Sequence, residues 1–387
     1  MKSFDLVLGD CLDILPTLPA ESVQTCVTSP PYWGLRDYGV GGQLGLEATV
    51  SEYVAKMVVV FREVRRVLRD DGTLWLNLGD SYAGGAQGNT RGAGAGGGKE
   101  RGQSMGFGAL PKRLDIESGL KNKDLVGIPW RVAFAMQADG WYLRQDIIWH
   151  KPNPMPESVI DRCTKSHEYI FLMAKSARYF YDAEAVREDG KTYTRKASGY
   201  VGFKATHIGQ NQKGGFADKD TTTTGRNKRS VWTVTTKPYR DAHFATFPPD
   251  LIEPCVLAGS ADKCCSKCGR AWERVIEVSR KEGREHLECG NMDERGVTRT
   301  TAGLSVPAEY KVKSTRTVGF RPACDCGETD SIPSTVLDPF NGAGTTGVVA
   351  IQHGRRYIGI ELNPDYLEMA RKRIQETRDG ITLPLGI

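Results

Sequence analysis

A short corner of the chain combines residue types that could hold a planar chemical group. Ser29, Pro30, Pro31 and Tyr32 follow an apolar run, and Trp33 comes directly after them. The two prolines fix the backbone, so the Ser29 hydroxyl and the Pro30 carbonyl can be presented as hydrogen-bond acceptors in one geometry. Tyr32 and Trp33 add flat aromatic faces for stacking. The stretch therefore predicts a rigid, aromatic, hydrogen-bond-accepting site.

The stretch "VLDPFNGAGTTG" at residues 336–347 is the candidate cofactor site. Its three glycines form a G-x-G-x-x-G between an expected strand and an expected helix, which lets the backbone approach a ligand closely. Glu361 follows about 20 residues later, where a carboxylate can bind the ribose hydroxyls of an adenosine-containing cofactor. NAD would satisfy these features equally well. The carboxylate of Asp338 suits an ammonium group better than a pyrophosphate, which favours S-adenosylmethionine.

Four of the ten cysteines have the spacing of a metal site. Cys265 and Cys268 form a C-x-x-C, Cys324 and Cys326 form a C-x-C, and each pair is followed at once by a glycine. Such turns can present four thiolates to one structural zinc ion. Four reduced surface thiols are the alternative reading, and two further cysteines compete as ligands: Cys264 and Cys289. Three others are expected in the core: Cys11, Cys26 and Cys163.

Strand-like apolar runs alternate with helical patterns along the chain, which predicts an α/β fold with a doubly wound parallel sheet. The expected strands are residues 4–10, 22–32, 73–82, 141–152, 168–176, 334–340 and 356–363. The expected helices are residues 51–72, 127–140, 248–259 and 364–380, with a turn and helix over 341–354.

Two segments interrupt this pattern. Residues 83–108 are so rich in glycine that a mobile surface loop is expected. Basic residues outnumber acids between Arg187 and Arg240, and this segment could neutralise the phosphates of a nucleic acid. A solvated loop is the alternative.

Several motifs together resemble the amino-group DNA methyltransferases, which modify the exocyclic amine of cytosine or adenine. The resembling stretches are "TSPPYW", "DPFNGAGTTG", "GIELNPDY", "DIIWHKPNPMPESVIDRCTKSHEYIFLMAKS" and "HFATFPPDL". Their order is similar to that of the family's beta class: catalytic motif, basic segment, then cofactor motif. The resemblance implies a Rossmann-like methyltransferase sheet with permuted motif order. Residues 1–182 would form its catalytic half, 183–240 a DNA target-recognition segment, and 241–387 the cofactor-binding half with a cysteine-rich insert at 261–330.

The resemblance also implies roles for single residues. Ser29 and Pro30 would accept hydrogen bonds from the amine of a base flipped out of duplex DNA, with Pro31 fixing the corner and Tyr32 stacking on the base. Glu361 would bind the ribose of S-adenosylmethionine. Asp10 would lie near the adenine of that cofactor, and Phe247 near its methionine end, although core packing is the alternative for Phe247. The methionine side of the pocket would be lined by Asp338, Phe340, Gly342, Gly344 and Thr345.

The base that would be modified is predicted from Ser29. Within the resembling family, serine before "PPY" is commoner in N4-cytosine enzymes and aspartate is usual in N6-adenine enzymes. Cytosine N4 is therefore favoured, with adenine N6 as the alternative. Cytosine C5 methylation would need a cysteine nucleophile, and Cys255 lies in an apolar helix-like segment where a core position is expected.

The expected partner is double-stranded DNA, with a homodimer and a cognate restriction endonuclease implied by the resemblance alone. The sequence has no apolar run near the roughly 20 residues needed to span a bilayer, so a cytoplasmic protein is expected. Two other classes stay open at this point. An NAD-dependent oxidoreductase could use the same sheet, and a non-catalytic DNA-binding protein could retain it, although both motifs of the site are intact.

Overall fold

The computed structural model describes residues 3–35, 39–83, 119–188, 226–236, 247–283 and 310–382. The glycine-rich segment predicted at 83–108 lies outside these ranges except for its first residue, and so does most of the basic segment. Among the helices of the described ranges, none combines the length and the apolar character that a bilayer span requires.

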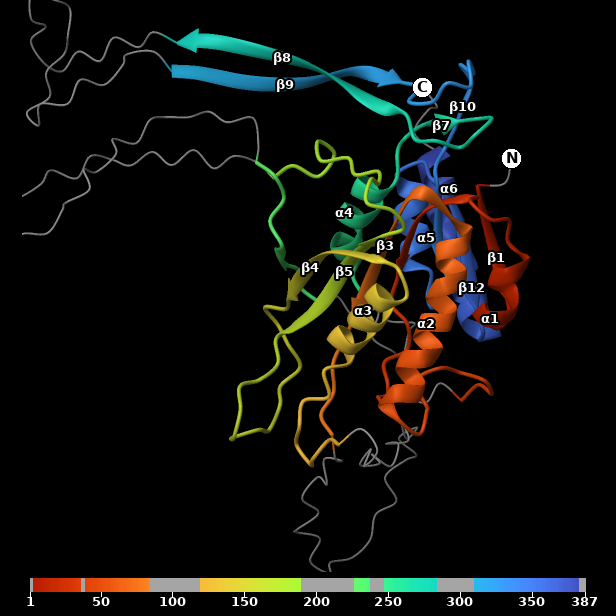
Figure 1. Cartoon of the computed structure of the whole chain (residues 1–387), viewed down its shortest axis with the longest axis vertical. Coiled ribbons are helices and arrows are strands. Elements are labelled where there is room, and N and C mark those ends of the chain that lie inside the picture. Colours follow the sequence, from red (N-terminus) through yellow and green to blue (C-terminus); the bar gives the residue numbers. More distant parts are fainter. Residues whose placement is uncertain are drawn as a thin grey trace, which may run out of the picture. The chain divides into compact units, whose positions relative to one another are not determined.

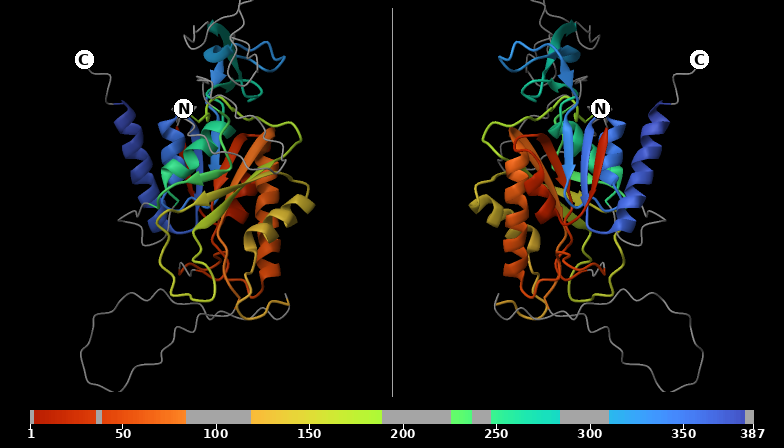
Figure 2. Two further views of the ribbon diagram at one scale, coloured as in Figure 1. Left: turned by 90° about the vertical axis from the view of Figure 1, so that its left-hand side faces the viewer. Right: turned by 90° about the vertical axis from the view of Figure 1, so that its right-hand side faces the viewer.

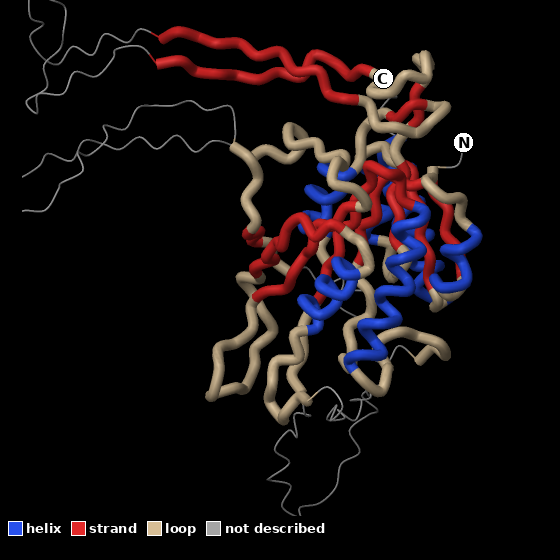
Figure 3. The backbone as a smooth tube through the Cα atoms, in the orientation of Figure 1, coloured by secondary structure: helices blue, strands red, loops and turns tan. Residues whose placement is uncertain are grey.

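An eight-stranded sheet forms the centre of the fold (Figures 1 and 3). Its strands, in spatial order, are β1 (Phe4–Leu8), β12 (Arg356–Glu361), β11 (Thr335–Asp338), β2 (Val23–Thr28), β3 (Leu68–Leu78), β5 (His167–Ala174), β4 (Tyr142–His150) and β6 (Val231–Thr233). β5 is antiparallel to β3 and β4, and the other pairs are parallel. The carboxyl ends of seven strands therefore share one edge of the sheet.

Helices cover both faces of this sheet, as Figure 2 shows for α2 (orange) and α6 (blue). One face carries α1 (Cys11–Ile14), the 3-10 turn η1 (Leu15–Thr17), α2 (Val50–Val67) and α3 (Ile128–Ala138). The other face carries α4 (Pro249–Gly259), α5 (Thr345–Gln352) and α6 (Pro364–Thr382). The doubly wound α/β fold predicted from the sequence is confirmed, but the sheet is mixed and not wholly parallel as expected, because β5 is antiparallel to its neighbours.

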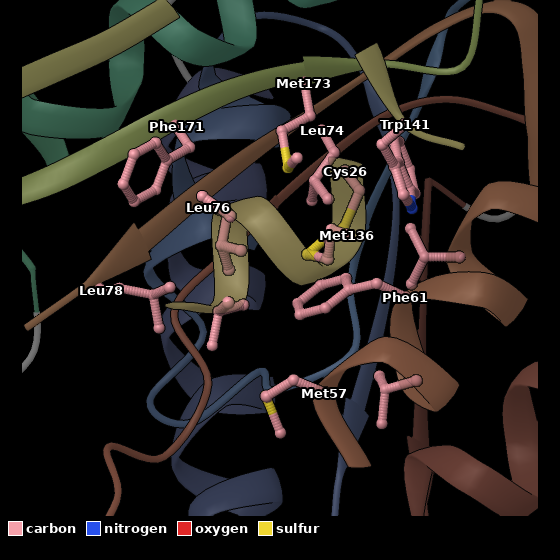
Figure 4. Close-up of a cluster of buried hydrophobic side chains, with 14 of the residues drawn as sticks. Cys26, Met57, Phe61, Leu74, Leu76, Leu78, Met136, Trp141, Phe171 and Met173 are labelled. Carbon is pink, nitrogen blue, oxygen red and sulfur yellow. The ribbon is translucent and has the colours of Figure 1, made fainter. Parts of the chain in front are cut away.

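Two hydrophobic cores follow from the alternation of side chains along the strands. Cys26 and Leu74 point to the first face, where they pack with Met57 and Phe61 of α2 (Figure 4). The next residue on each strand points the other way, and Trp75 packs in the second core with α4. Both faces of the central strands are apolar, as expected for parallel strands buried on both sides.

The helix predicted over residues 51–72 is shorter than expected. Thr49 caps α2 through a capping box with Glu52, and the helix ends at Val67. Leu68 already belongs to β3, where it is fully buried and pairs with Val23. Pairing with a neighbouring strand outweighs the helical pattern over these last residues.

Within the described ranges, five further strands lie where no strand was expected. β6 falls inside the basic segment predicted at 183–240, but it pairs with β4, and Trp232 packs into the second core. The other four form two small sheets in and next to the insert predicted at 261–330. One pairs β7 (Cys264–Cys265) with β10 (Ser331–Ile332), and the other pairs β8 (Glu273–Gly283) with β9 (Tyr310–Arg321).

The chain divides into two compact units. The first comprises residues 1–186, 229–273 and 321–387 and contains the eight-stranded sheet. The second comprises residues 187–228 and 274–320, where Arg226 forms an ion pair of 2.9 Å with Glu188 and the Arg274 guanidinium lies over the Phe320 ring. Residues 229–236 thus belong to the unit with the sheet.

Of the cysteines expected in the core, Cys11 and Cys26 are buried, but Cys163 is exposed because it lies in the β4–β5 loop.

Candidate active site

A cavity of about 920 Å³ lies at the carboxyl edge of the sheet. The strand ends supply its walls: Asp10 follows β1, Ser29 follows β2, Lys151 follows β4, Phe340 follows β11, and Glu361 ends β12. Open α/β sheets bind ligands at this edge, and the volume is at the upper end of the roughly 300–1,000 Å³ typical of ligand pockets.

Most of the residues predicted for methyl transfer line this one cavity. They are Asp10, Ser29, Pro30, Pro31, Tyr32, Phe247, Phe340, Gly342, Thr345 and Glu361. Asp338, Gly344 and Trp33 are not among its lining residues. The Trp33 indole instead donates a hydrogen bond of 3.0 Å to the Glu47 carbonyl and packs against the first core.

Glu361 holds the glycine turn and also faces the cavity. Its Oε2 accepts a hydrogen bond of 2.7 Å from the Gly342 amide, and its Oε1 accepts one of 2.9 Å from the Asn363 amide. Burial raises the pKa of this carboxyl. Each oxygen retains a second lone pair, so the carboxylate can accept the hydroxyls of a ribose while it fixes the turn.

Asp338 lies beneath the cavity wall. It is 1% exposed, and its carboxylate accepts hydrogen bonds from the Thr28 hydroxyl at 2.6 Å, the Thr346 hydroxyl at 2.8 Å and the Phe340 amide at 3.0 Å. Burial outweighs these hydrogen bonds and raises the pKa of Asp338 to about 6. The carboxylate therefore organises the turn between β11 and α5 from below.

The glycines of the G-x-G-x-x-G have different structural tasks. Gly342 reaches the cavity, as expected. Gly344 has a φ of 75°, and a β-carbon there would lie 2.8 Å from the Ala370 side chain of α6. A β-carbon at Gly347 would lie 2.4 Å from Ile374 of the same helix. Gly344 and Gly347 thus allow α5 to pack closely on α6.

The Ser29 corner is tied into a hydrogen-bond network. The Ser29 hydroxyl lies 3.3 Å from both the Tyr32 hydroxyl and Asn77 Oδ1. The Tyr32 hydroxyl lies 2.8 Å from Glu168 Oε2, which it can reach as donor, and 3.1 Å from Asn77 Oδ1. The Tyr53 hydroxyl donates to the Pro31 carbonyl at 2.9 Å. The corner is therefore held at Tyr32 by its own hydroxyl and at Pro31 by the hydroxyl of Tyr53.

Sequence reasoning missed three polar residues of this cavity: Asn77, Lys151 and Glu168. Asn77 is 3% exposed on β3, Lys151 follows β4, and Glu168 lies at the start of the antiparallel β5. The sequence feature that could have identified them is a polar residue at either terminus of an apolar strand. That signal becomes decisive only when the strand order is known, because the antiparallel β5 brings its first residues to the edge where the parallel strands end.

The Tyr32 ring packs directly on Gly79, which gives a test of its position. A β-carbon at Gly79 would lie 2.4 Å from the ring. Gly79→Ala should therefore displace Tyr32 and, for the methyl transfer that the motifs imply, lower the rate about 10- to 100-fold, while the affinity for S-adenosylmethionine stays within about twofold. Calorimetry and single-turnover kinetics would measure the two effects. Gly380→Ala is the matched control, since a β-carbon there meets nothing within 4 Å. An unchanged rate in Gly79→Ala would show that Tyr32 is not needed in this position.

The four predicted cysteines also come together. The sulfur atoms of Cys265, Cys268, Cys324 and Cys326 all lie within 4.8 Å of one another. Cys264 is not in this group, because its sulfur lies 3.1 Å from the Ser334 hydroxyl in a buried position. Cys289 lies outside the described residues.

Fold and site together define a class: a doubly wound α/β protein in which one cavity combines a glycine turn, a carboxylate and a hydrogen-bonding corner at one edge of the sheet. A family model described as DNA methylase matches residues 23–263 and 331–372. The chain is 41% identical to the type II methyltransferase M.Cfr9I of Citrobacter freundii, over 95% of this chain and 86% of that protein. It is 37% identical to the type II methyltransferase M.SmaI of Serratia marcescens, over 98% and 93% of the two chains.

A solved structure shares the fold. The PvuII DNA methyltransferase, described as cytosine-N4-specific, superposes with a TM-score of 0.51 at 15% identity, over 98% of this chain and 93% of that chain. The chain belongs to the DNA methylase family. It is an S-adenosylmethionine-dependent DNA amino-methyltransferase, and the family resemblance found in its motifs is confirmed.

Proposed function

We propose that the protein transfers a methyl group from S-adenosylmethionine to the N4 amine of cytosine in duplex DNA, at a specific sequence. The observation that supports this proposal is that the Ser29 corner and the glycine turn bound by Glu361 line a single cavity. A methyl donor on the turn and a flipped base in the corner would then share this cavity. Holding two reactants in this way contributes much of the rate of a displacement reaction.

The donor side of the cavity fits an adenosyl cofactor whose sulfonium supplies the methyl group. Glu361 would accept the ribose hydroxyls, and Asp10 would lie at the adenine end. Phe340, Gly342 and Thr345 would line the methionine end. Phe247 is half-buried, lines the cavity and also packs against the second core, which fits a place near the methionine end of the cofactor as well as a packing role.

The acceptor side fits an amine on a planar ring. An exocyclic amine is a poor nucleophile because its lone pair is delocalised into the ring. Hydrogen bonds from its N–H groups to Ser29 Oγ and the Pro30 carbonyl would favour a pyramidal nitrogen with a free lone pair. Stacking on Tyr32 would offset part of the few kcal/mol needed to flip the base. The full burial of the Cys255 thiol in α4 argues against a C5 mechanism through this residue.

Ser29 is the reason for proposing cytosine, with adenine N6 as the second candidate, since both amines offer the same donors to this corner. The basic segment 183–240 is proposed to contact DNA, and residues 229–236 would connect it to the sheet. The relatives are named type II methyltransferases, which supports a cognate restriction endonuclease as partner. A homodimer and a cytoplasmic location remain part of the proposal.

The test is transfer of labelled methyl groups to mixed-sequence duplex DNA, with RNA as the competing substrate. We expect acid-stable label in DNA and none in RNA. Thermal shift against S-adenosylmethionine and NAD is the companion measurement, because a ligand that binds the folded state raises its apparent stability. Stabilisation by NAD alone would favour the oxidoreductase reading. Cofactor binding without any transfer would favour a binding protein.

We also propose that Cys265, Cys268, Cys324 and Cys326 bind one structural zinc ion. Four thiolates around zinc at about 2.3 Å lie about 3.8 Å apart, which small movements of the present cluster would reach. The backbone after each cysteine pair forms a tight turn. The Gly269 amide donates a hydrogen bond of 2.8 Å to the Cys265 carbonyl, and Gly269 and Gly327 have positive φ values of 68° and 66°. The cysteines also lie between the two ranges that the family model matches, so this site would be an addition to the shared fold.

Elemental analysis tests the zinc proposal. We expect about one zinc per chain in the purified protein and none after Cys265→Ser with Cys268→Ser. Cys163→Ser is the matched control, because Cys163 is exposed and lies outside the cluster. Circular dichroism would confirm that the double variant is folded. Wild-type protein that contains no zinc and takes up none when zinc chloride is added would overturn the proposal.

A further inference from the structure

Methyl transfer to an amine releases a proton. The residues proposed to bind S-adenosylmethionine and the flipped base do not include a group that accepts it. When the amine nitrogen forms its bond to the methyl carbon, the bond from that carbon to the donor sulfur would break and leave its electron pair on sulfur. The nitrogen gains a positive charge and must then lose one N–H proton. Ser29 is the nearest proposed acceptor, but a serine hydroxyl is a very weak base. Some stronger proton acceptor must therefore lie within hydrogen-bond reach, directly or through a relay.

A directed chain of hydrogen bonds leads away from Ser29. The Ser29 hydroxyl can donate to Tyr32 Oη at 3.3 Å, and the Tyr32 hydroxyl donates to Glu168 Oε2 at 2.8 Å. Asn77 is the other neighbour of both hydroxyls, but an amide oxygen does not take up a proton at neutral pH. Glu168 is therefore the carboxylate at the end of this chain.

Glu168 is held ready for this task. Lys151 forms an ion pair with its Oε1, which leaves Oε2 facing the Tyr32 hydroxyl. The Lys151 ammonium is fixed in turn over the Trp149 ring, 4.2 Å from its centre. Burial, followed by the charge of Glu168, raises the pKa of the Tyr32 phenol well above its usual value, so Tyr32 is protonated and can donate. The Glu168 side chain is 17% exposed, so a proton that reaches it can pass on to water.

We propose that Glu168 is the terminal proton acceptor of methyl transfer, acting through Tyr32 and Ser29. The amine proton passes to Ser29 Oγ, the Ser29 proton to Tyr32 Oη, and the Tyr32 proton to Glu168 Oε2. Ser29 and Tyr32 end as they began, the amine ends neutral and methylated, and Glu168 releases the proton to solvent. This inference rests on the proposed function, and it applies to the amine of either base. Glu168 is thus a positioning residue that works through the corner.

The decisive variant is Glu168→Gln. Glutamine keeps an oxygen that can accept the Tyr32 hydrogen bond, so a merely structural anchor would survive, but it cannot take the proton. We expect the single-turnover rate of methyl transfer to fall about 100-fold, with cofactor and DNA affinities within about twofold of wild type. Tyr32→Phe breaks the same relay and should lose a similar factor. The double variant should be no slower than the slower single variant, because residues that act as one unit are not additive.

Glu253→Gln is the matched control, since this glutamate is half-exposed, pairs with His353 and is outside the cavity. A Glu168→Gln rate within about twofold of wild type, or rate losses that multiply in the double variant, would overturn the relay. Wild-type protein that transfers no methyl group would instead overturn the proposed function. The two failures are therefore distinguishable in one experiment.

Discussion

Ser29→Ala is expected to slow methyl transfer about 100- to 1,000-fold at saturating cofactor. The reason is that one preorganised hydrogen-bond partner at a reacting group contributes about this factor in enzymes. In this protein Ser29 is also the first group of the route by which the amine proton leaves, and the Ser29 hydroxyl lies 3.3 Å from the next member, Tyr32. Single-turnover kinetics with labelled S-adenosylmethionine would measure the loss.

The affinity of Ser29→Ala for S-adenosylmethionine should stay close to that of wild type. Ser29 follows β2, whereas the cofactor turn follows β11, so the substitution should leave the turn intact. Calorimetry on the same preparation supplies this control. Loss of cofactor affinity in step with the rate would contradict the placement of Ser29 at the base.

Asp338→Asn is expected to make the free protein more stable and its cofactor binding weaker. In the folded state burial raises the pKa of Asp338 from 3.8 to about 6. The folded state therefore holds this proton more tightly than the unfolded chain, and the free energy of unfolding falls as the pH rises from about 4 to about 6. The loss amounts to about 3 kcal/mol at most. Asparagine removes the charge, and the Thr346 hydroxyl can turn to the Val27 carbonyl at 3.3 Å to accommodate the new amide.

Denaturant unfolding of the two proteins across this pH range would measure the first effect. The variant should be the more stable protein above about pH 6, and the difference should vanish below about pH 4. Cofactor affinity should fall about 10- to 100-fold, since a buried carboxylate is weakly screened and attracts an ammonium in the adjoining cavity. Unchanged affinity would show that Asp338 only holds the turn.

Much of the site could be predicted because parallel α/β sheets gather their strand ends at one edge. Ser29 and Glu361 lie near the ends of expected strands, Gly342 follows another, and the fold brings all three to one cavity. Asp338 shows the limit of this reasoning. Its position just before the turn suggested direct contact with a cofactor, but the hydroxyls of Thr28 and Thr346, distant in sequence, draw its carboxylate beneath the cavity.

The Glu168 network could not be predicted from sequence for a related reason. Glu168 is 136 residues from its partner Tyr32 along the chain. Only the antiparallel course of β5 beside β3 and β4 brings its first residues to the active-site edge. The sequence showed an apolar strand at this position but not its direction. Strand order and direction are long-range properties, and they decide which polar strand ends meet.

The measurement that tests the central claim most directly is the identity of the methylated nucleoside. Mixed-sequence duplex DNA would be incubated with the protein and labelled S-adenosylmethionine, digested to nucleosides and separated by mass spectrometry. We predict N4-methylcytosine as the labelled product, absent when Ser29→Ala replaces the wild-type protein at matched short times. N6-methyladenine would keep the amine mechanism but contradict the choice of base that Ser29 indicates, and 5-methylcytosine would contradict the mechanism itself.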